Sequence, residues 1–285
     1  MSVSVVAFFD KATYTLTYVV FDEKTLDSIV IDPVLNYDPA SSKISYESVN
    51  EVEKFVSDNK LKVHYILETH AHADHLTGAV ELKKRLNAKV GIGKNITAVQ
   101  DVFSSVYNLK NLNCDGSQFD ILLSEQDLLN AGSLEVKTLF TPGHTPACSS
   151  YIIGDNVFTG DALFMPDYGT GRCDFPSGSA KELYHSIHEK LYKLPDDYKI
   201  FTGHDYQPNS RELMYQSTIG ESKKSNIQLK NNTTEDEYIK FREDRDKTLS
   251  APRLLLPSIQ VNINGGELPE AEDNNVSYLK IPIRE

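Results

Sequence analysis

Four predicted β-strands in this chain end in the same way, and this repeated pattern limits the folds that the sequence can adopt. Each apolar strand stops at or near a threonine, and the turn that follows presents a histidine or an aspartate. The strands end at Leu67, Phe140, Thr159 and Thr202, and their turns carry His70, His144, Asp161 and His204. A rigid sheet can hold such residues without burying unpaired backbone groups. We therefore expect the four turns to converge around one cation.

The first turn has the highest density of potential metal ligands. In the order His70-x-His72-x-Asp74-His75, it holds three of the eight histidines of the chain. A single histidine after a strand is more often a packed or hydrogen-bonded residue, but the four turns together favour a metal centre. Imidazole suits zinc, iron and copper alike, so the residue types do not select the metal.

Periodicity in the rest of the chain predicts strands and helices that alternate in both halves. Strands are predicted at 3–9, 14–21, 28–31, 63–67, 89–92, 119–123, 134–140, 150–153, 157–159 and 199–202, and helices at 47–59, 76–86, 95–106, 179–191 and 234–249. We expect a polar loop at 36–45 and, from 254, a proline-broken tail strapped over the body. The pattern suits an α/β fold of two packed sheets with helices outside.

Size and charge narrow the function classes. The 285 residues are expected to form a single domain, with 207–285 as a C-terminal extension packed on it. The net charge of −12 argues against nucleic acid or an anionic membrane as a partner. The three cysteines form no disulfide framework, so a reducing cytoplasm is the expected location. No apolar run reaches 18 residues, so no membrane span is expected.

The complete ligand set, in this order and spacing, resembles the metallo-β-lactamase superfamily over roughly residues 1–205. The resemblance implies an αββα sandwich, two mixed sheets with helices on the outside and a metal site at the edge. It also implies one metal site formed by His70, His72 and His144, a second formed by Asp74, His75 and His204, and Asp161 as the bridge between them.

Three further segments, Gly160–Phe164, Gly171–Phe175 and Gly203–Tyr206, look like those of the sulfur (persulfide) dioxygenases, and especially of bacterial branches labelled β-lactamase-like. This resemblance implies one Fe(II) per chain on His70, His144 and Asp161, with zinc as a substitute or in a second site. His72, Asp74, His75 and His204 would then orient these ligands or form that second site. The implied reaction oxidises glutathione persulfide, or a similar persulfide, to sulfite with O2. A homodimer and a sulfurtransferase partner remain open.

Two residues are candidates for substrate recognition. Arg172 is a candidate for binding a carboxylate of an anionic persulfide, although a structural ion pair with Asp174 is an equal alternative. Tyr206 is a candidate hydrogen-bond donor to sulfur or oxygen, and otherwise a tyrosine at the core edge. Cys173 stands where the mitochondrial dioxygenases have threonine, and Thr170 where they have cysteine, which makes the transfer of substrate contacts less secure.

Two other function classes compete with the dioxygenase. A binuclear hydrolase of a glutathione thioester, in the manner of glyoxalase II, or of a β-lactam or lactone, would use both metal positions. Against it stand the Gly171–Phe175 and His204–Tyr206 segments, and a tail expected to lack a helical glutathione-binding extension. A non-catalytic scaffold is the third class, but such members tend to lose ligands, and none is lost here.

Overall fold

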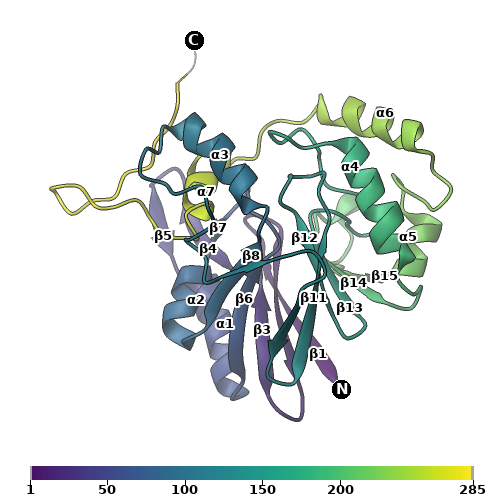
Figure 1. Ribbon diagram of the computed structural model, residues 1–285, viewed down its shortest axis with the longest axis horizontal. Coiled ribbons are helices and arrows are strands. Elements are labelled where there is room, and N and C mark those ends of the chain that lie inside the picture. The colour runs from purple at the N-terminus through teal and green to yellow at the C-terminus, as the bar shows by residue number, and fades with distance from the viewer. Residues whose placement is uncertain (1, 284–285) are drawn as a thin grey trace.

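Two six-stranded sheets form the centre of the computed structural model, which describes residues 2–283 (Figure 1). The first sheet has the order β1 (Val3–Asp10), β2 (Thr15–Asp22), β3 (Asp27–Ile31), β6 (Lys62–Glu68), β8 (Lys89–Gly93) and β9 (Ile121–Leu123). The second has the order β10 (Leu128–Ala131), β11 (Leu134–Phe140), β12 (Ser149–Ile153), β13 (Asn156–Gly160), β14 (Lys199–Thr202) and β15 (Gln216–Thr218). Each sheet mixes parallel and antiparallel pairs, as predicted for the αββα sandwich.

Helices cover both outer faces of the sandwich (Figure 1). The first sheet is covered by α1 (Glu47–Asp58), α2 (Ala79–Leu86), α3 (Ile96–Tyr107) and α7 (Leu255–Asn262). The second is covered by α4 (Ala180–His185), which continues in π and 3-10 turns to Lys193, and by α5 (Ile219–Ser225) and α6 (Glu235–Asp246). Within residues 2–283, no helix is both long and apolar enough to cross a bilayer.

Alternation along the central strands explains why they are buried on both faces. On β2, Leu16, Tyr18 and Val20 face the opposite sheet, whereas Val19 packs under the helices. Ile29 and Val30 on β3 divide in the same way. Successive strand side chains point to opposite faces, so the near-continuous apolar runs in the sequence place these strands in the middle layer.

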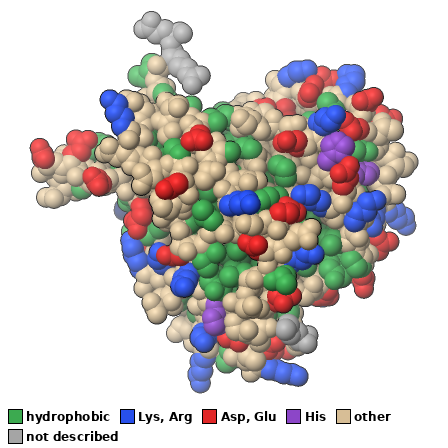
Figure 2. All heavy atoms as spheres, viewed as in Figure 1, with side chains coloured by type: hydrophobic (Ala, Val, Ile, Leu, Met, Phe, Trp, Pro, Cys, Tyr) green, Lys and Arg blue, Asp and Glu red, His purple; other side chains and the backbone are tan. Residues whose placement is uncertain are grey.

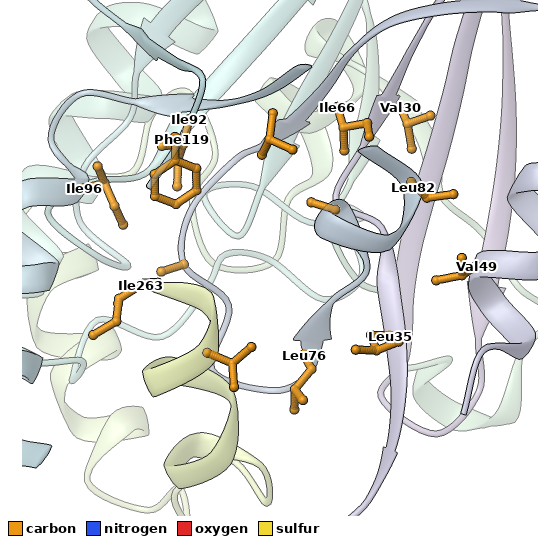
Figure 3. Close-up of a cluster of buried hydrophobic side chains, with 14 of the residues drawn as sticks. Val30, Leu35, Val49, Ile66, Leu76, Leu82, Ile92, Ile96, Phe119 and Ile263 are labelled. Carbon is orange, nitrogen blue, oxygen red and sulfur yellow. The ribbon is translucent and has the colours of Figure 1, made fainter. Parts of the chain in front are cut away.

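The tail contributes to the core more than the sequence suggested. The apolar tail expected from 254 packs on the body, but its proline does not break it: α7 forms there with Pro257 in its first turn. Proline is tolerated at that position since a first-turn N–H has no partner within the helix. Ile263, directly after α7, belongs to the same buried cluster as Ile96 and Phe119 (Figure 3).

Other boundaries also differ from the predictions. The loop expected at 36–45 contains β4 (Val34–Asp38) and β5 (Lys43–Ser45), which pair with each other, and β4 also pairs with β7 (Leu76–Thr77). Leu76 was expected in a helix, but α2 begins at Ala79, after this strand. The strands β10 and β15 and the helix α5 are short and lack strong periodicity, and they were not anticipated.

The two sheets are linked at one end by a carboxyl group. Asp27 on β3 accepts hydrogen bonds from the Ser133 backbone N–H (2.8 Å), in the β10–β11 turn, and pairs with His64 Nε2 (2.6 Å) on β6. The hydrogen bond from His64, supported by Ser133, lowers the pKa of Asp27 from 3.8 to about 2. Because the folded pKa lies below that of the unfolded chain, ionised Asp27 stabilises the fold at neutral pH.

We expect Asp27→Asn to lower the free energy of unfolding at pH 6. This difference from wild type should shrink as the pH falls from about 4 toward about 2, where the wild-type carboxyl also becomes protonated. Urea titrations at a series of pH values measure it. Asp58→Asn is the control, because its ion pair with Lys54 is exposed and should contribute little. A pH-independent difference for Asp27→Asn would contradict the assignment.

Candidate metal centre

The four strand ends singled out in the sequence meet at one edge of the sandwich. His70 follows β6 of the first sheet, and His144, Asp161 and His204 follow β11, β13 and β14 of the second. Two tyrosines hold the sheets together there. Tyr18 donates to the Thr202 carbonyl (2.6 Å), and Tyr151 donates to the Glu68 carbonyl (2.7 Å), each reaching the last residue of a strand in the opposite sheet.

His70, His144 and Asp161 form one compact group of potential ligands. One donor atom from each lies within 4.8 Å of the other two, and all three side chains are buried. His144 Nε2 is 3.5 Å from Asp161 Oδ2, and the ring centroids of His70 and His144 are 5.1 Å apart. Two imidazoles and one carboxylate are thus held together by contacts from both sheets.

The remaining four predicted residues lie beside this group. His72, Asp74 and His75 form a second cluster with donor atoms within 4.8 Å of one another. His204 Nε2 lies 3.5 Å from Asp74 Oδ2 and 3.3 Å from Asp161 Oδ1. Asp161 therefore contacts His144 with one oxygen and His204 with the other, as a carboxylate between two sites would.

The donor atoms fit a metal cation because they are buried and have no other partner. Within residues 2–283, His70 Nε2, His75 Nε2, His204 Nε2 and Asp161 Oδ1 have no hydrogen-bond partner. Orphaned buried polar atoms are rare in folded proteins and are costly unless something satisfies them. Their concentration at one point supports a metal site.

Outer hydrogen bonds determine which nitrogen of each ring faces inward. His144 Nδ1 donates to the Arg172 carbonyl (2.6 Å), and His204 Nδ1 to the Tyr14 carbonyl (3.2 Å). The Nε2 lone pair of each ring then points to the centre, an arrangement common among metal-binding histidines. His72 has the opposite arrangement, because its Nε2 lies 3.1 Å from Asp32 Oδ1 and 3.2 Å from Glu68 Oε2.

The protonation states of the cluster residues favour the binding of a cation. Burial, together with the neighbouring His72 and His144, holds the pKa of His70 well below 6.5, so this imidazole is neutral at pH 7. Burial would lower the pKa of His204, but Asp161 and Asp74 outweigh it and raise that pKa. Burial would also raise the pKa of Asp74, but His204 and His75 keep it well below its ordinary value. A bound cation would replace the protons that these carboxylates attract.

Two glycines allow the strand ends to approach closely. Gly160, with φ of +49°, leads into Asp161, and a Cβ there would lie 2.5 Å from Thr69 Oγ1. A Cβ on Gly203 would lie 2.8 Å from Asp161 Oδ1. Any side chain at either position would push the turns apart, which explains why both turns begin with glycine.

A cavity of about 680 Å³ opens beside His144 and Asp161. Its wall includes Tyr206, whose ring stacks on Tyr168 (centroids 4.8 Å apart) and on His204 (5.4 Å). Tyr206 therefore lies beside the centre with 37% exposure, and its role as a hydrogen-bond donor to substrate stays a prediction.

Arg172 also lines the cavity, but its guanidinium group is already occupied. Its Nε and Nη2 atoms bind the two oxygens of Asp174 (2.5 and 2.6 Å), and its Nη1 donates to the Ser250 carbonyl (2.7 Å). The structural ion pair, one of the two alternatives from the sequence, is the arrangement present. Asp174 neutralises the charge of Arg172, so the guanidinium group is not free to bind a substrate anion.

Sequence reasoning missed three residues that support the centre. Asp32 and Glu68 flank His72, and Asp32 also accepts hydrogen bonds from Thr69 N and Thr69 Oγ1 (both 2.7 Å). Asn262, in the tail, bonds to the backbone of the turn that carries His72 and His75. A carboxylate directly after a strand, as in Ile31-Asp32, was the available signal for Asp32, whereas nothing local distinguished Asn262.

Comparison with known proteins gives a consistent family. The model of the metallo-β-lactamase superfamily matches residues 11–204. A probable metallo-hydrolase of Burkholderia pseudomallei is 44% identical over 98% of this chain and 99% of its own length. Glyoxylase B2 of Dictyostelium discoideum is 48% identical over 93% of this chain and 91% of its own length.

Persulfide dioxygenases also match. The human mitochondrial persulfide dioxygenase ETHE1 is 34% identical over 70% of this chain and 66% of its own length. The crystal structure of ETHE1 from Myxococcus xanthus superimposes with a TM-score of 0.75 at 30% identity, and the match covers 93% of this chain and all of that one.

Proposed function

Because the chain belongs to the metallo-β-lactamase superfamily, we propose that it is an iron-dependent persulfide dioxygenase. It oxidises glutathione persulfide, or a similar low-molecular-weight persulfide. In the balanced reaction RSSH, O2 and H2O give RSH, sulfite and two protons. The main support for this proposal is the buried group of His70, His144 and Asp161. This group adjoins a cavity that is large enough for a small thiol conjugate.

The chain's residues fit one Fe(II) at this group. His70 is neutral and His144 is oriented by the Arg172 carbonyl, so both present a lone pair beside the carboxylate of Asp161. Two histidines and one carboxylate are the ligand set of many non-haem Fe(II) oxygenases. Bound iron would supply the redox chemistry toward O2 that amino-acid side chains lack. Imidazole also binds zinc, so zinc can substitute in a preparation.

The charges around the cavity favour an anionic carrier. Two of its arginines, Arg172 and Arg242, are neutralised by Asp174 and Asp246. Within residues 2–283, the other two, Arg245 and Arg253, form no ion pair, and Arg245 only donates to Thr248 Oγ1 (3.0 Å). A chain of net charge −12 thus places two unneutralised cations around this cavity, where they can bind the carboxylates of a carrier such as glutathione.

We expect the double variant Arg245→Gln and Arg253→Gln to raise KM for glutathione persulfide by about tenfold, with a smaller change in kcat. The KM for the persulfide of glutathione diethyl ester, which lacks both carboxylate charges, should stay nearly unchanged. The double variant Lys240→Gln and Lys247→Gln is the control, because it makes an equal charge change at two exposed lysines, one on α6 and one directly after it. Equal effects on both substrates would contradict recognition through charge.

The activity itself is tested with protein loaded anaerobically with Fe(II). Addition of glutathione persulfide in air should consume O2 and produce sulfite in equal amounts, measured with an oxygen electrode and a sulfite assay. Zinc-loaded protein should consume none. Absence of O2 uptake by protein with one iron per chain would overturn the proposal.

A hydrolase of a glutathione thioester is the second candidate, and two observations favour it. His72, Asp74, His75 and His204 are all retained and adjoin the first group, so a second metal ion has potential ligands. The extension also contributes α6, the helix predicted at 234–249, to the wall of the cavity. Metal content near two per chain, with hydrolysis of S-lactoylglutathione and no O2 uptake, would establish this alternative.

A further inference from the structure

The turn that carries four of the predicted ligands lacks backbone hydrogen bonds of its own. Residues 70–75 connect β6 to β7 and belong to no helix or strand. Within residues 2–283, no backbone N–H donates to their carbonyl groups, and their own N–H groups donate to no backbone carbonyl. The side chain of Asp74 accepts bonds from His75 Nδ1 and Thr15 Oγ1 (both 3.1 Å), but a turn without internal backbone hydrogen bonds does not by itself fix the path of its backbone.

One side chain from the far end of the chain supplies the missing bonds. Asn262 Nδ2 donates to the carbonyls of His72 and His75 (both 2.8 Å), and its Oδ1 accepts from the Thr77 N–H (2.9 Å). Both amide hydrogens and the amide oxygen are therefore used. The side chain is buried, with 3% exposure, so water does not compete for these bonds.

The helix that carries Asn262 is itself firmly held. Asn262 is the last residue of α7, and the neighbouring Ile259, Val261 and Ile263 are fully buried in the core, where α7 packs against α3 and β7. Gln100 of α3 also donates to the Ile263 carbonyl (2.9 Å). Because α7 packs against α3 as well as against β7, the strand that follows the turn, Asn262 links the turn to the core.

We propose that Asn262 is a positioning residue of the metal centre. By fixing the carbonyls of His72 and His75, it sets the path of the turn between them, and so the direction of His72, Asp74 and His75. The family match ends at residue 204, so the C-terminal extension completes a centre whose ligands all precede it. The inference concerns metal binding and does not depend on which reaction the protein catalyses.

Asn262→Asp is the most specific test, because it keeps the shape and the acceptor for Thr77 but removes both donors. The new carboxylate would face two carbonyl oxygens and repel them. Loss of a partner that orients metal ligands typically weakens metal binding by about 10- to 100-fold, and we expect a decrease in this range.

Asn156→Asp is the matched control. Asn156 is also buried, at 2% exposure, and its Nδ2 donates to the Ile153 carbonyl (3.0 Å) in the β12–β13 turn, outside the ligand turns. Both variants are expected to lower the unfolding temperature of the metal-free protein. Only Asn262→Asp should weaken Co(II) and Zn(II) binding, measured by competition with a chelator, and alter the visible spectrum of the Co(II) protein.

Wild-type metal affinity and an unchanged Co(II) spectrum in folded Asn262→Asp would overturn the proposal. An equal loss of affinity in Asn156→Asp would also overturn it, because the effect would then be one of general stability. Should Asn262→Asp fail to fold, Asn262→Ser decides, since its hydroxyl retains a single donor. Weakened metal binding in that variant supports the positioning role, and wild-type binding rejects it.

Discussion

Asp161→Asn will abolish stable metal binding and, with it, the activity of the protein. Asp161 is the one carboxylate in the first cluster, and its two oxygens lie 3.5 Å from His144 and 3.3 Å from His204. Asparagine keeps the shape but removes the charge that attracts the cation. Loss of an outer partner already costs about 10- to 100-fold in affinity, so loss of a ligand should cost more than about 100-fold.

Elemental analysis of the purified variant measures this directly, and less than about 0.1 metal per chain is expected. Asp155→Asn is the control, because it makes the same charge change at the opposite end of β13, where Asp155 forms an exposed pair with Lys199. That variant should retain the wild-type metal content. A full metal complement in Asp161→Asn would remove Asp161 from the ligand set, and with it the basis of the proposed function.

Asp32→Ala is expected to have the largest effect on stability, lowering the free energy of unfolding by about 3–5 kcal/mol. Asp32 is 2% exposed and accepts bonds from both the N–H and the hydroxyl of Thr69, and it pairs with His72. Its removal leaves buried donors without partners and takes a negative charge away from a buried imidazole. Alanine also fits poorly at the φ of +49° that Asp32 adopts.

Asp32→Asn separates these causes. Asparagine tolerates positive φ and can still accept from the Thr69 N–H, so it removes mainly the charge and should cost less than alanine. Urea unfolding of the metal-free proteins gives both values, and metal-free protein is needed because a bound metal adds its own stabilisation. A loss below about 1 kcal/mol for Asp32→Ala would show that the Asp32–His72 contact contributes little.

On the face shown in Figure 2, lysine and arginine side chains are interspersed with aspartate and glutamate, without a continuous basic surface. Among the arginines that line the cavity, Arg245 and Arg253 form no ion pair within residues 2–283, and they are the two that the proposed function uses. Sequence inspection favoured Arg172 instead, because it lies in a glycine-bounded turn, and could not decide whether Asp174 occupies it.

Most of the central strands and the cluster of candidate metal ligands could be predicted from the sequence, because both depend on local signals. The apolar strands around Leu16, Ile66 and Phe158 can be recognised within a few residues, and each metal ligand follows such a strand in a short turn. The convergence of His70, His144 and Asp161 could also be expected, because each follows a strand and the ends of strands in packed sheets lie close together.

Tertiary structure alone decided what surrounds these ligands. Asn262 reaches His72 across 190 positions of the chain, and Asp32 reaches Thr69 across 37. The sequence around an asparagine at the end of a helix looks the same whether its side chain faces water or forms hydrogen bonds to a buried turn, as Asn262 does. Only the packing of α7 against the first sheet determines which of these it does, because burial and partners at that distance depend on every element between them.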